Sequence, residues 1–366
     1  MSITAEAVLK ALSFVDDPDL KKDIVTLGMV KNLSVEGKRV SFTVELTTPA
    51  CPMKEHIRKA CETAVRHMVD KTADIHIDMT ARVSSARDGS PVLPGVRNII
   101  AVASGKGGVG KSTIAVNLAL ALARSGARVG LIDADIYGPS IPLMLDLEGA
   151  APQVLEENGK PVMIPVEKDG LKVLSIGFMV DTSQAVVWRG PMASSALRQF
   201  VQDCRWGELD YLVLDMPPGT GDIHLTLVQT VPVTGVVMVT TPQEVALADA
   251  RKGVAMFRMP NINVPVLGVV ENMSYFTPAE LPNNRYYLFG QGGGRRLADA
   301  LGIPLLAEIP LVQSIREGGD SGRPAVLNDD DPISRLAFEH MAFEVARQVS
   351  LRNANMAPSQ PVEVRV

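Results

Sequence analysis

The sequence predicts an α/β fold with a mainly parallel, doubly wound sheet, preceded by a small α+β domain. A glycine-rich segment, Ser104–Thr113, lies between an apolar run and a segment with helical spacing. Further apolar runs alternate with helical patterns along the chain, which is typical of buried parallel strands joined by helices. Of the 366 residues, 46% are hydrophobic but only 4% aromatic. The predicted core is therefore largely aliphatic.

Residues 1–84 are expected to form the small α+β domain, because helical spacing and strand alternation both occur there. The predicted helices are 4–14 and 52–69, and the predicted strands are 40–46 and 75–79. Residues 85–95 are polar and rich in Gly and Pro, so we expect a linker.

Residues 96–351 are expected to form the larger domain. Its predicted strands are 99–103, 129–132, 173–176, 211–214, 236–239, 266–270 and 305–309, and its predicted helices are 114–124, 192–203, 243–257, 294–301 and 332–351. On the last helix, the apolar side chains expected to pack on the sheet are Ile333, Leu336, Met341, Val345 and Val349. The tail 352–366 contains two prolines and is expected to be disordered.

The glycine-rich segment reads SGKGGVGKST and fits the phosphate-loop pattern G-x-x-x-x-G-K-[ST]. Backbone N–H groups and a helix N-terminus in this pattern surround the phosphates of a nucleotide. Lys111 is expected on the β- and γ-phosphates, and Ser112 on Mg²⁺. The predicted nucleotide-binding residues of the loop are Gly105, Lys106, Gly107, Gly108, Val109, Gly110, Lys111, Ser112 and Thr113.

A second lysine, Lys106, follows the first glycine of the loop. Its ammonium is not expected to reach the phosphates bound by its own loop. It is placed to stabilise charge across a dimer interface, as an arginine finger does.

Carboxylates follow two of the predicted strands, where ligands bind in such sheets. Asp133 and Asp135 are two residues apart after one strand, so one can face the metal shell and the other an attacking water. Asp215 follows another strand, the arrangement in which a carboxylate holds Mg²⁺ directly or through water. Gly219 lies shortly after it, and its N–H can sense a γ-phosphate. Each stretch could also be a solvated turn.

The segments GKGGVGKST and DMPPGTGD resemble the deviant Walker A loop and switch II of the MinD, ParA and nitrogenase-reductase ATPases. The resemblance implies a P-loop NTPase fold, slow ATP hydrolysis and a homodimer in which Lys106 contacts the partner's nucleotide. It makes Asp135 the residue that orients the attacking water. It also implies that Asn272 reads the adenine edge.

The first domain contains TTPACPMK, in which Pro52 suits the first position of a helix. Cys51 would then be the N-cap, where the helix dipole favours the thiolate. Such a thiolate is a candidate ligand for iron or an iron–sulfur cluster. The alternative is a small apolar cap without chemistry.

DDPDLKKDIVTLGMV and VELTTPACPMK resemble the iron–sulfur assembly domain of Mrp/ApbC-type proteins, matching at Asp17, Asp19, Thr48 and Cys51. This implies an iron–sulfur cluster carrier that delivers its cargo to apo-proteins or works with assembly factors. Many such proteins carry Cys-x-x-Cys after the Asn-Met-Ser segment, but residues 275–286 contain no cysteine. Cargo is then handled through Cys51 or has been lost. Trp188-Arg189 also resembles this type and is expected to serve a partner, a dimer surface or a helix start.

The formal net charge of −5 and the absence of a long basic run argue against nucleic acid as a partner. No signal peptide or membrane-spanning apolar run is visible, and three cysteines cannot form a disulfide framework. We therefore expect a cytoplasmic protein without a membrane partner. The alternative function is a ParA/MinD-like dimeric switch ATPase that acts on a protein without carrying a cluster. A nucleotide-gated scaffold with negligible turnover is a third possibility.

Overall fold

In the computed structural model, the chain forms two compact units. Unit 1 comprises residues 1–84 and 350–355, and unit 2 comprises residues 85–349 and 356–366. The residues that the structure describes are 3–87, 92–157, 159–179, 190–278, 280–281 and 284–362.

Unit 1 is built on a three-stranded sheet in which the middle strand is antiparallel to one neighbour and parallel to the other. Its side chains alternate, so that Val40, Phe42, Val44 and Leu46 are buried against the two helices. A two-residue ladder precedes the sheet. The elements are α1 (Ala5–Leu12), β1 (Asp16–Asp17), β2 (Lys22–Asp23), β3 (Val30–Glu36), β4 (Arg39–Leu46), α2 (Lys54–Met68) and β5 (Asp74–Ala81).

Unit 2 contains an eight-stranded sheet with the order β10-β11-β7-β12-β6-β13-β14-β15. All neighbours are parallel except β10 and β11. The fold class predicted from the sequence is therefore confirmed. The strands are β6 (Val96–Ser104), β7 (Val129–Asp133), β10 (Val166–Lys168), β11 (Leu171–Ser175), β12 (Leu209–Asp215), β13 (Gly235–Thr240), β14 (Val266–Glu271) and β15 (Leu305–Glu308).

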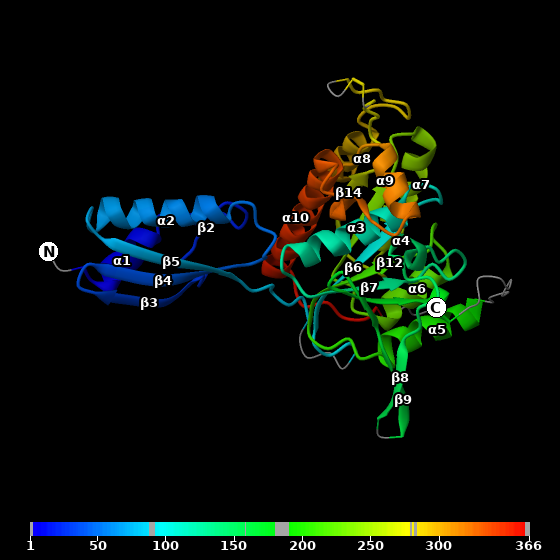
Figure 1. Ribbon diagram of the computed structural model, residues 1–366, viewed down its shortest axis with the longest axis horizontal. Coiled ribbons are helices and arrows are strands. Elements are labelled where there is room, and N and C mark those ends of the chain that lie inside the picture. The colour runs from blue at the N-terminus through cyan, green and yellow to red at the C-terminus, as the bar shows by residue number, and fades with distance from the viewer. Residues whose placement is uncertain are drawn as a thin grey trace. The chain divides into compact units, whose positions relative to one another are not determined.

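Helices connect these strands, and a separate hairpin of two strands is inserted before β10 (Figure 1). The hairpin consists of β8 (Gln153–Glu157) and β9 (Lys160–Ile164). The helices are α3 (Lys111–Arg124), α4 (Ile141–Met144), α5 (Gly190–Gln202), α6 (Asp222–Thr230), α7 (Glu244–Phe257), α8 (Gly293–Leu301), α9 (Gln313–Asp320) and α10 (Pro332–Asn355), with 3-10 turns at Ile176–Phe178 and Ala325–Leu327.

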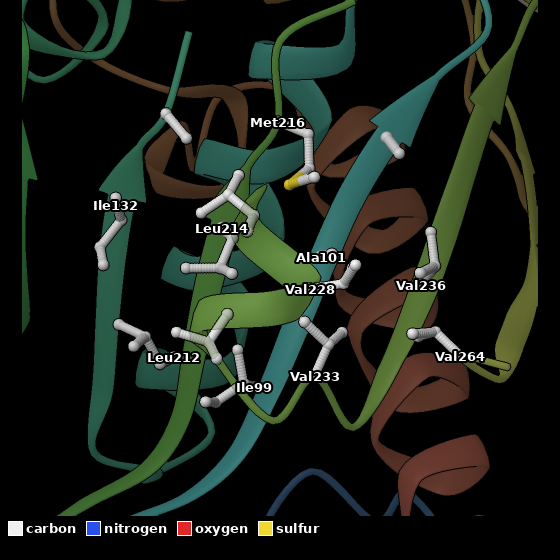
Figure 2. Packing of buried hydrophobic residues seen from close by; sticks show 14 of the residues in the cluster. Ile99, Ala101, Ile132, Leu212, Leu214, Met216, Val228, Val233, Val236 and Val264 are labelled. Atoms are coloured by element: carbon white, nitrogen blue, oxygen red, sulfur yellow. The ribbon is translucent and has the colours of Figure 1, made fainter. Parts of the chain in front are cut away.

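The sheet is covered on both faces. Successive side chains of β6 point to opposite faces and enter different parts of the core. Ile99 and Ala101 belong to a cluster that includes residues of α5, α6 and α7. Figure 2 shows part of this cluster, with Val228 of α6 over the strands. Ile100 and Val102 are equally buried but lie outside that cluster, and α3 contacts β6, β7 and β12. The nucleotide-binding motif thus begins on a central strand buried from both sides.

The segment before β6 differs from the linker expected at 85–95. The Arg87 guanidinium donates hydrogen bonds to the carbonyls of Leu93 and Val96 at 2.7 and 2.8 Å. The backbone N–H of Ala86 donates to the carbonyl of Arg97 at 3.1 Å. The described part of this segment is therefore held on unit 2, because the arginine satisfies carbonyls that a turn leaves free.

The last helix and the tail also differ from the sequence prediction. Ile333 and Leu336 are 55% and 57% exposed, so the expectation that they pack on the sheet is wrong. The other expected residues, Met341, Val345 and Val349, are buried together with Phe338. Leu336 lies two residues from Phe338, on the opposite side of the helix. α10 continues to Asn355.

Beyond α10, the backbone of the tail is hydrogen-bonded to unit 2. The N–H of Ser359 donates to the carbonyl of Ala86 at 2.6 Å, and the N–H of Val362 donates to that of Val228 at 3.0 Å. The described residues up to 362 therefore do not behave as the disordered tail that its prolines suggested.

Candidate functional site

The phosphate loop joins β6, which ends at Ser104, to α3, which begins at Lys111. Gly110 caps the helix in the left-handed conformation with φ +80°, and a Cβ there would overlap the side-chain amide of Asn272. Gly105 lies so close to α7 that a Cβ would overlap the backbone of Asp249. These glycines are thus required by the positions of neighbouring elements.

The loop borders a cavity of about 220 Å³ at the carboxyl ends of the strands. The cavity is lined by most of the predicted phosphate-binding residues together with residues from both acidic segments. These are Ser104, Lys106, Gly107, Gly108, Gly110, Lys111, Ser112, Thr113, Asp135, Ser140, Met144 and Pro218. The structure therefore brings together groups that are far apart in sequence.

Lys111 lies at the centre of this cavity's charge arrangement. Its Nζ is 2.5 Å from Oδ1 of Asp215 and 3.9 Å from Oδ2 of Asp135. The hydroxyl of Ser112 donates to Oδ2 of Asp215 at 2.6 Å. Lys111 is 6% exposed and Asp215 is fully buried, so water has little access to the pair and their attraction is weakly screened.

Carboxylates outnumber cations here, and their burial changes their acidity. Burial raises the pKa of Asp215, whereas the nearby ammonium of Lys111 acts in the opposite direction. Burial also raises the pKa of Asp135 and of Asp133, and the charge of Asp215 raises that of Asp133 further. The oxygen atoms of these side chains are hard donors that suit a divalent cation, whose charge would oppose the effect of burial.

Asp133 has a role that the sequence pattern did not distinguish from that of Asp135. Its carboxylate is fully buried and accepts a hydrogen bond from the Ser175 hydroxyl at 2.9 Å. It also accepts from the backbone N–H of Asp135 at 3.2 Å and of Ile141 at 3.4 Å. Asp133 therefore fixes the turn that presents Asp135 to the cavity. Spacing alone could not show which of the two carboxylates lines the cavity and which is buried in the protein.

Gly219 in the second acidic segment has φ +92°. Its N–H donates to the carbonyl of Ser104 at 2.9 Å, at the start of the phosphate loop. The predicted contact of this N–H with a γ-phosphate therefore requires the segment to change conformation.

Asn272 follows β14 and is 6% exposed. Its Nδ2 donates to the carbonyl of Val109 at 2.9 Å, so the side chain holds the backbone of the phosphate loop. Its oxygen is an acceptor and leaves the predicted adenine contact chemically available.

Lys106 lines the cavity but makes no side-chain ion pair with any residue that the structure describes. Its ammonium is thus not used within the described chain, in contrast to that of Lys111.

The predicted environment of Cys51 is wrong in one respect. Helix α2 begins at Lys54 and is capped by Met53, so Cys51 is not the N-cap. Pro52 and Met53 form a turn in which the N–H of Lys54 donates to the carbonyl of Cys51 at 3.4 Å. Burial raises the pKa of the half-buried Cys51 thiol, and the charges of Asp19 and Asp17 raise it further.

Burial also raises the pKa of the other two cysteine thiols. Cys61 is fully buried in α2, and burial raises its pKa to about 12. Cys204 lies in unit 2, and burial raises its pKa to about 12 as well. Among the described residues, no group of three or more His, Cys, Asp or Glu side chains is arranged to hold a metal ion.

Trp188 and Arg189 lie outside the described residues. In the described part of the loop after Asn272, Phe276 pairs with Tyr286 in a short bridge, and the Arg285 guanidinium lies 4.2 Å from the centre of the Tyr275 ring. Aromatic contacts thus occupy a region where the resemblance suggested cysteines. Within the described part of the chain, no helix is long and apolar enough to cross a membrane.

Comparison with known proteins gives two family matches that together cover most of the chain. Residues 95–346 match the model described as NUBPL iron-transfer P-loop NTPase, and residues 5–78 match the one described as iron-sulfur cluster assembly protein. The chain is 50% identical to an iron-sulfur cluster carrier protein of Synechocystis sp., over 95% of this chain and 99% of that protein. It is 48% identical to an iron-sulfur cluster carrier protein of Deinococcus radiodurans, over 97% and 98% respectively.

A solved structure is similar to about two thirds of this chain. The nucleotide-binding protein of Archaeoglobus fulgidus in complex with ADP is 39% identical, with a TM-score of 0.56. The match covers 66% of this chain and 91% of that protein.

Proposed function

Because this chain belongs to the iron-transfer P-loop NTPase family, we propose that it is an iron–sulfur cluster carrier that binds and hydrolyses ATP. The observation that carries the nucleotide part is the cavity in which the phosphate loop, Lys111 and two acidic strand ends meet. The cargo part is supported by the assembly-protein match over residues 5–78 and by carriers that are similar over nearly the full chain.

In the proposed mechanism, the backbone N–H groups of residues 107–112 surround the phosphates, and Lys111 contacts the β- and γ-phosphates. Ser112 and Asp215 present adjacent oxygen donors, which fit Mg²⁺ as direct or water-bridged ligands. When bound, this ion would neutralise phosphate charge. Asp135 positions the attacking water, and Asp133 holds the turn that carries Asp135.

The ammonium of Lys111 is paired with Asp215. The phosphates would compete with Asp215 for this ammonium, so we propose that binding exchanges one anionic partner for another. Asp215 is then left with Ser112 for the metal shell. The exchange links nucleotide entry to the segment that contains Gly219.

We further propose a homodimer in which Lys106 reaches the nucleotide of the second subunit. The position of Lys106 at the cavity without an intrachain ion pair supports this. A complementation experiment tests it. Lys106→Ala and Asp135→Asn should each hydrolyse ATP slowly alone, but their mixture should recover activity. In a mixed dimer, the site of the Lys106→Ala chain has its own Asp135 and receives Lys106 from the other chain. No recovery in dimers shown to exchange subunits would contradict the trans role.

The cluster is a transient substrate of this protein. Residues 275–286 contain no cysteine, so two subunits do not supply there the four thiolates that usually hold a [4Fe-4S] cluster. Glu280 in the loop after Asn272 is a hard oxygen donor and does not replace a soft thiolate. We therefore propose that Cys51 contributes one ligand and that thiols of an apo-protein or assembly factor complete the set.

Anaerobic loading with iron and sulfide tests this assignment. The intact chain and Cys204→Ser should both bind iron and show thiolate-cluster absorbance, whereas Cys51→Ser should not. Equal iron in Cys51→Ser would remove Cys51 from the cargo site. Iron in none of the three chains would favour the alternative of a ParA/MinD-like ATPase that acts on a protein partner without carrying a cluster.

The domain limits 1–84 and 96–351 are proposed as functional domains for cargo and for nucleotide, respectively. A cytoplasmic location also remains a prediction.

A further inference from the structure

Glu271 is a buried carboxylate at the end of β14 that the proposed mechanism does not use. Its side chain is 0% exposed. It accepts hydrogen bonds from the hydroxyl of Ser274 and from the backbone N–H of Gly294. A charge removed from water is costly unless such donors are in place. These two contacts are therefore specific requirements of the local structure.

The two donors mark the two ends of one segment. Ser274 is the third residue of the loop after β14, and Gly294 is in the first turn of α8. The free N–H groups and the dipole of a helix N-terminus favour an anion. One carboxylate thus anchors the start of the loop and the helix to which the loop returns.

Between Glu271 and Ser274 the backbone makes an unusual turn. Met273 has φ +54°, a left-handed conformation that is rare for a residue of this type. The flanking backbone is also tied: the N–H of Asn272 donates to Thr240, and that of Ser274 to Ile309, at 2.8 and 2.9 Å. Such a conformation persists when surrounding contacts determine it, and it often marks a functional position.

The turn controls the position of Asn272, whose amide holds the carbonyl of Val109 in the phosphate loop. Gly110, which follows Val109, caps α3 directly above that amide. A shift of the turn would therefore displace the support of the loop that is expected to bind phosphate.

We propose that Glu271 is a positioning residue for nucleotide binding. By holding Ser274 and Gly294, it keeps Met273 in its left-handed turn and Asn272 against Val109. The proposal rests on the proposed nucleotide-binding function. It assigns Glu271 no contact with nucleotide.

The test measures binding of ADP with Mg²⁺ by titration calorimetry. Glu271→Leu leaves both donors without a partner and should weaken ADP binding about tenfold. Glu271→Gln should bind within about threefold of the parent, because its amide oxygen can accept from Gly294 while its NH₂ donates to Ser274. Glu308→Leu is the matched control, since Glu308 is the register partner on β15 and is exposed. It should bind like the parent.

Two further variants separate positioning from a general loss of structure. Ser274→Ala removes one donor only, and should weaken ADP binding about threefold even if Glu271→Leu does not fold. Combining Glu271→Leu with Asn272→Ala should cause no further loss beyond Asn272→Ala alone, because both act through the same contact.

Parental ADP affinity in both Glu271→Leu and Ser274→Ala would overturn the inference, as would an additive loss in the double variant. If Glu271→Gln were as weak as Glu271→Leu, the hydrogen-bond assignment would be wrong. A parent chain that binds no ADP would instead refute the proposed nucleotide function, so the two failures are distinguishable.

Discussion

Replacing Lys111 with methionine should destabilise unit 2 even in the absence of nucleotide. The ammonium lies 2.5 Å from Asp215 and 3.9 Å from Asp135. At an effective dielectric constant of about 20, these contacts correspond to about 7 and about 4 kcal/mol of Coulomb attraction. The cost of burying the lysine offsets much of this. Removing one partner of a buried pair typically costs about 3–5 kcal/mol, because it leaves an uncompensated charge.

Urea unfolding in EDTA, followed by tryptophan fluorescence, measures this effect. Trp206 is buried in unit 2, and the sequence of unit 1 contains no tryptophan. Lys111→Met should lower the free energy of unfolding of this unit by about 3–5 kcal/mol. Lys106→Met is the control, because Lys106 makes no ion pair with the described residues. It should remain within about 0.5 kcal/mol of the parent.

The Lys111→Met deficit should also depend on pH. Burial raises the pKa of Asp215, and loss of the ammonium that opposes this shift should raise it further. The native variant should then bind a proton that the unfolded chain lacks, so its stability should recover as pH falls from about 8 toward 5. A deficit below about 0.5 kcal/mol at pH 8, or one that grows on acidification, would refute the electrostatic reasoning.

Three further predictions concern other parts of the molecule. Gly110→Ala should weaken ADP binding about tenfold, because the φ of Gly110 is +80° and a Cβ would overlap the amide of Asn272. Gly319→Ala is the control, because the space at its Cβ is open, and it should bind ADP like the parent. Equal ADP affinities of the two variants, measured by titration calorimetry, would contradict this. Phe42→Ala should cost unit 1 about 3–5 kcal/mol, measured by circular dichroism, without changing ADP affinity, because Phe42 is 2% exposed in a core confined to unit 1; loss of ADP binding would argue against independent units. His224 is 1% exposed, and burial lowers its pKa from 6.5, so acidification below about pH 6.5 protonates it mainly in the unfolded chain and reduces stability by up to about 1.4 kcal/mol per pH unit. The urea midpoint should therefore fall less steeply between pH 7 and pH 5 in His224→Leu than in the parent. Identical slopes in the two chains would exclude this contribution.

The features that the sequence predicted well are those determined locally. The order strand, glycine loop and helix around Lys111 is written in adjacent residues, and the apolar runs locate the sheet because parallel strands are buried on both faces. The hairpin β8–β9 was not predicted, although Asn158-Gly159 between its strands is a common hairpin signal. Its strands lack a regular apolar alternation, since Val154 and Leu155 are adjacent and both exposed.

The features that were missed depend on contacts between distant segments. Pro52 is compatible with the first position of a helix, but the chain turns there and the helix begins two residues later, at Lys54. The buried carboxylate of Asp133 accepts a hydrogen bond from Ser175, which is 42 residues away. The importance of Glu271 depends on Gly294, which is 23 residues away. Local spacing contains no information about these partners.

The central position of β6 also determines when the nucleotide site can form during synthesis. Val96 pairs with Leu209 of β12, and Ile100 pairs with Gly235 of β13. As the chain leaves the ribosome, β6 and its glycine loop emerge long before these neighbours do. A strand without neighbours cannot hold the loop in shape, so nucleotide cannot stabilise the nascent chain until β13 is available. The motif that is easiest to recognise in the sequence therefore cannot act until much more of the chain has been synthesised.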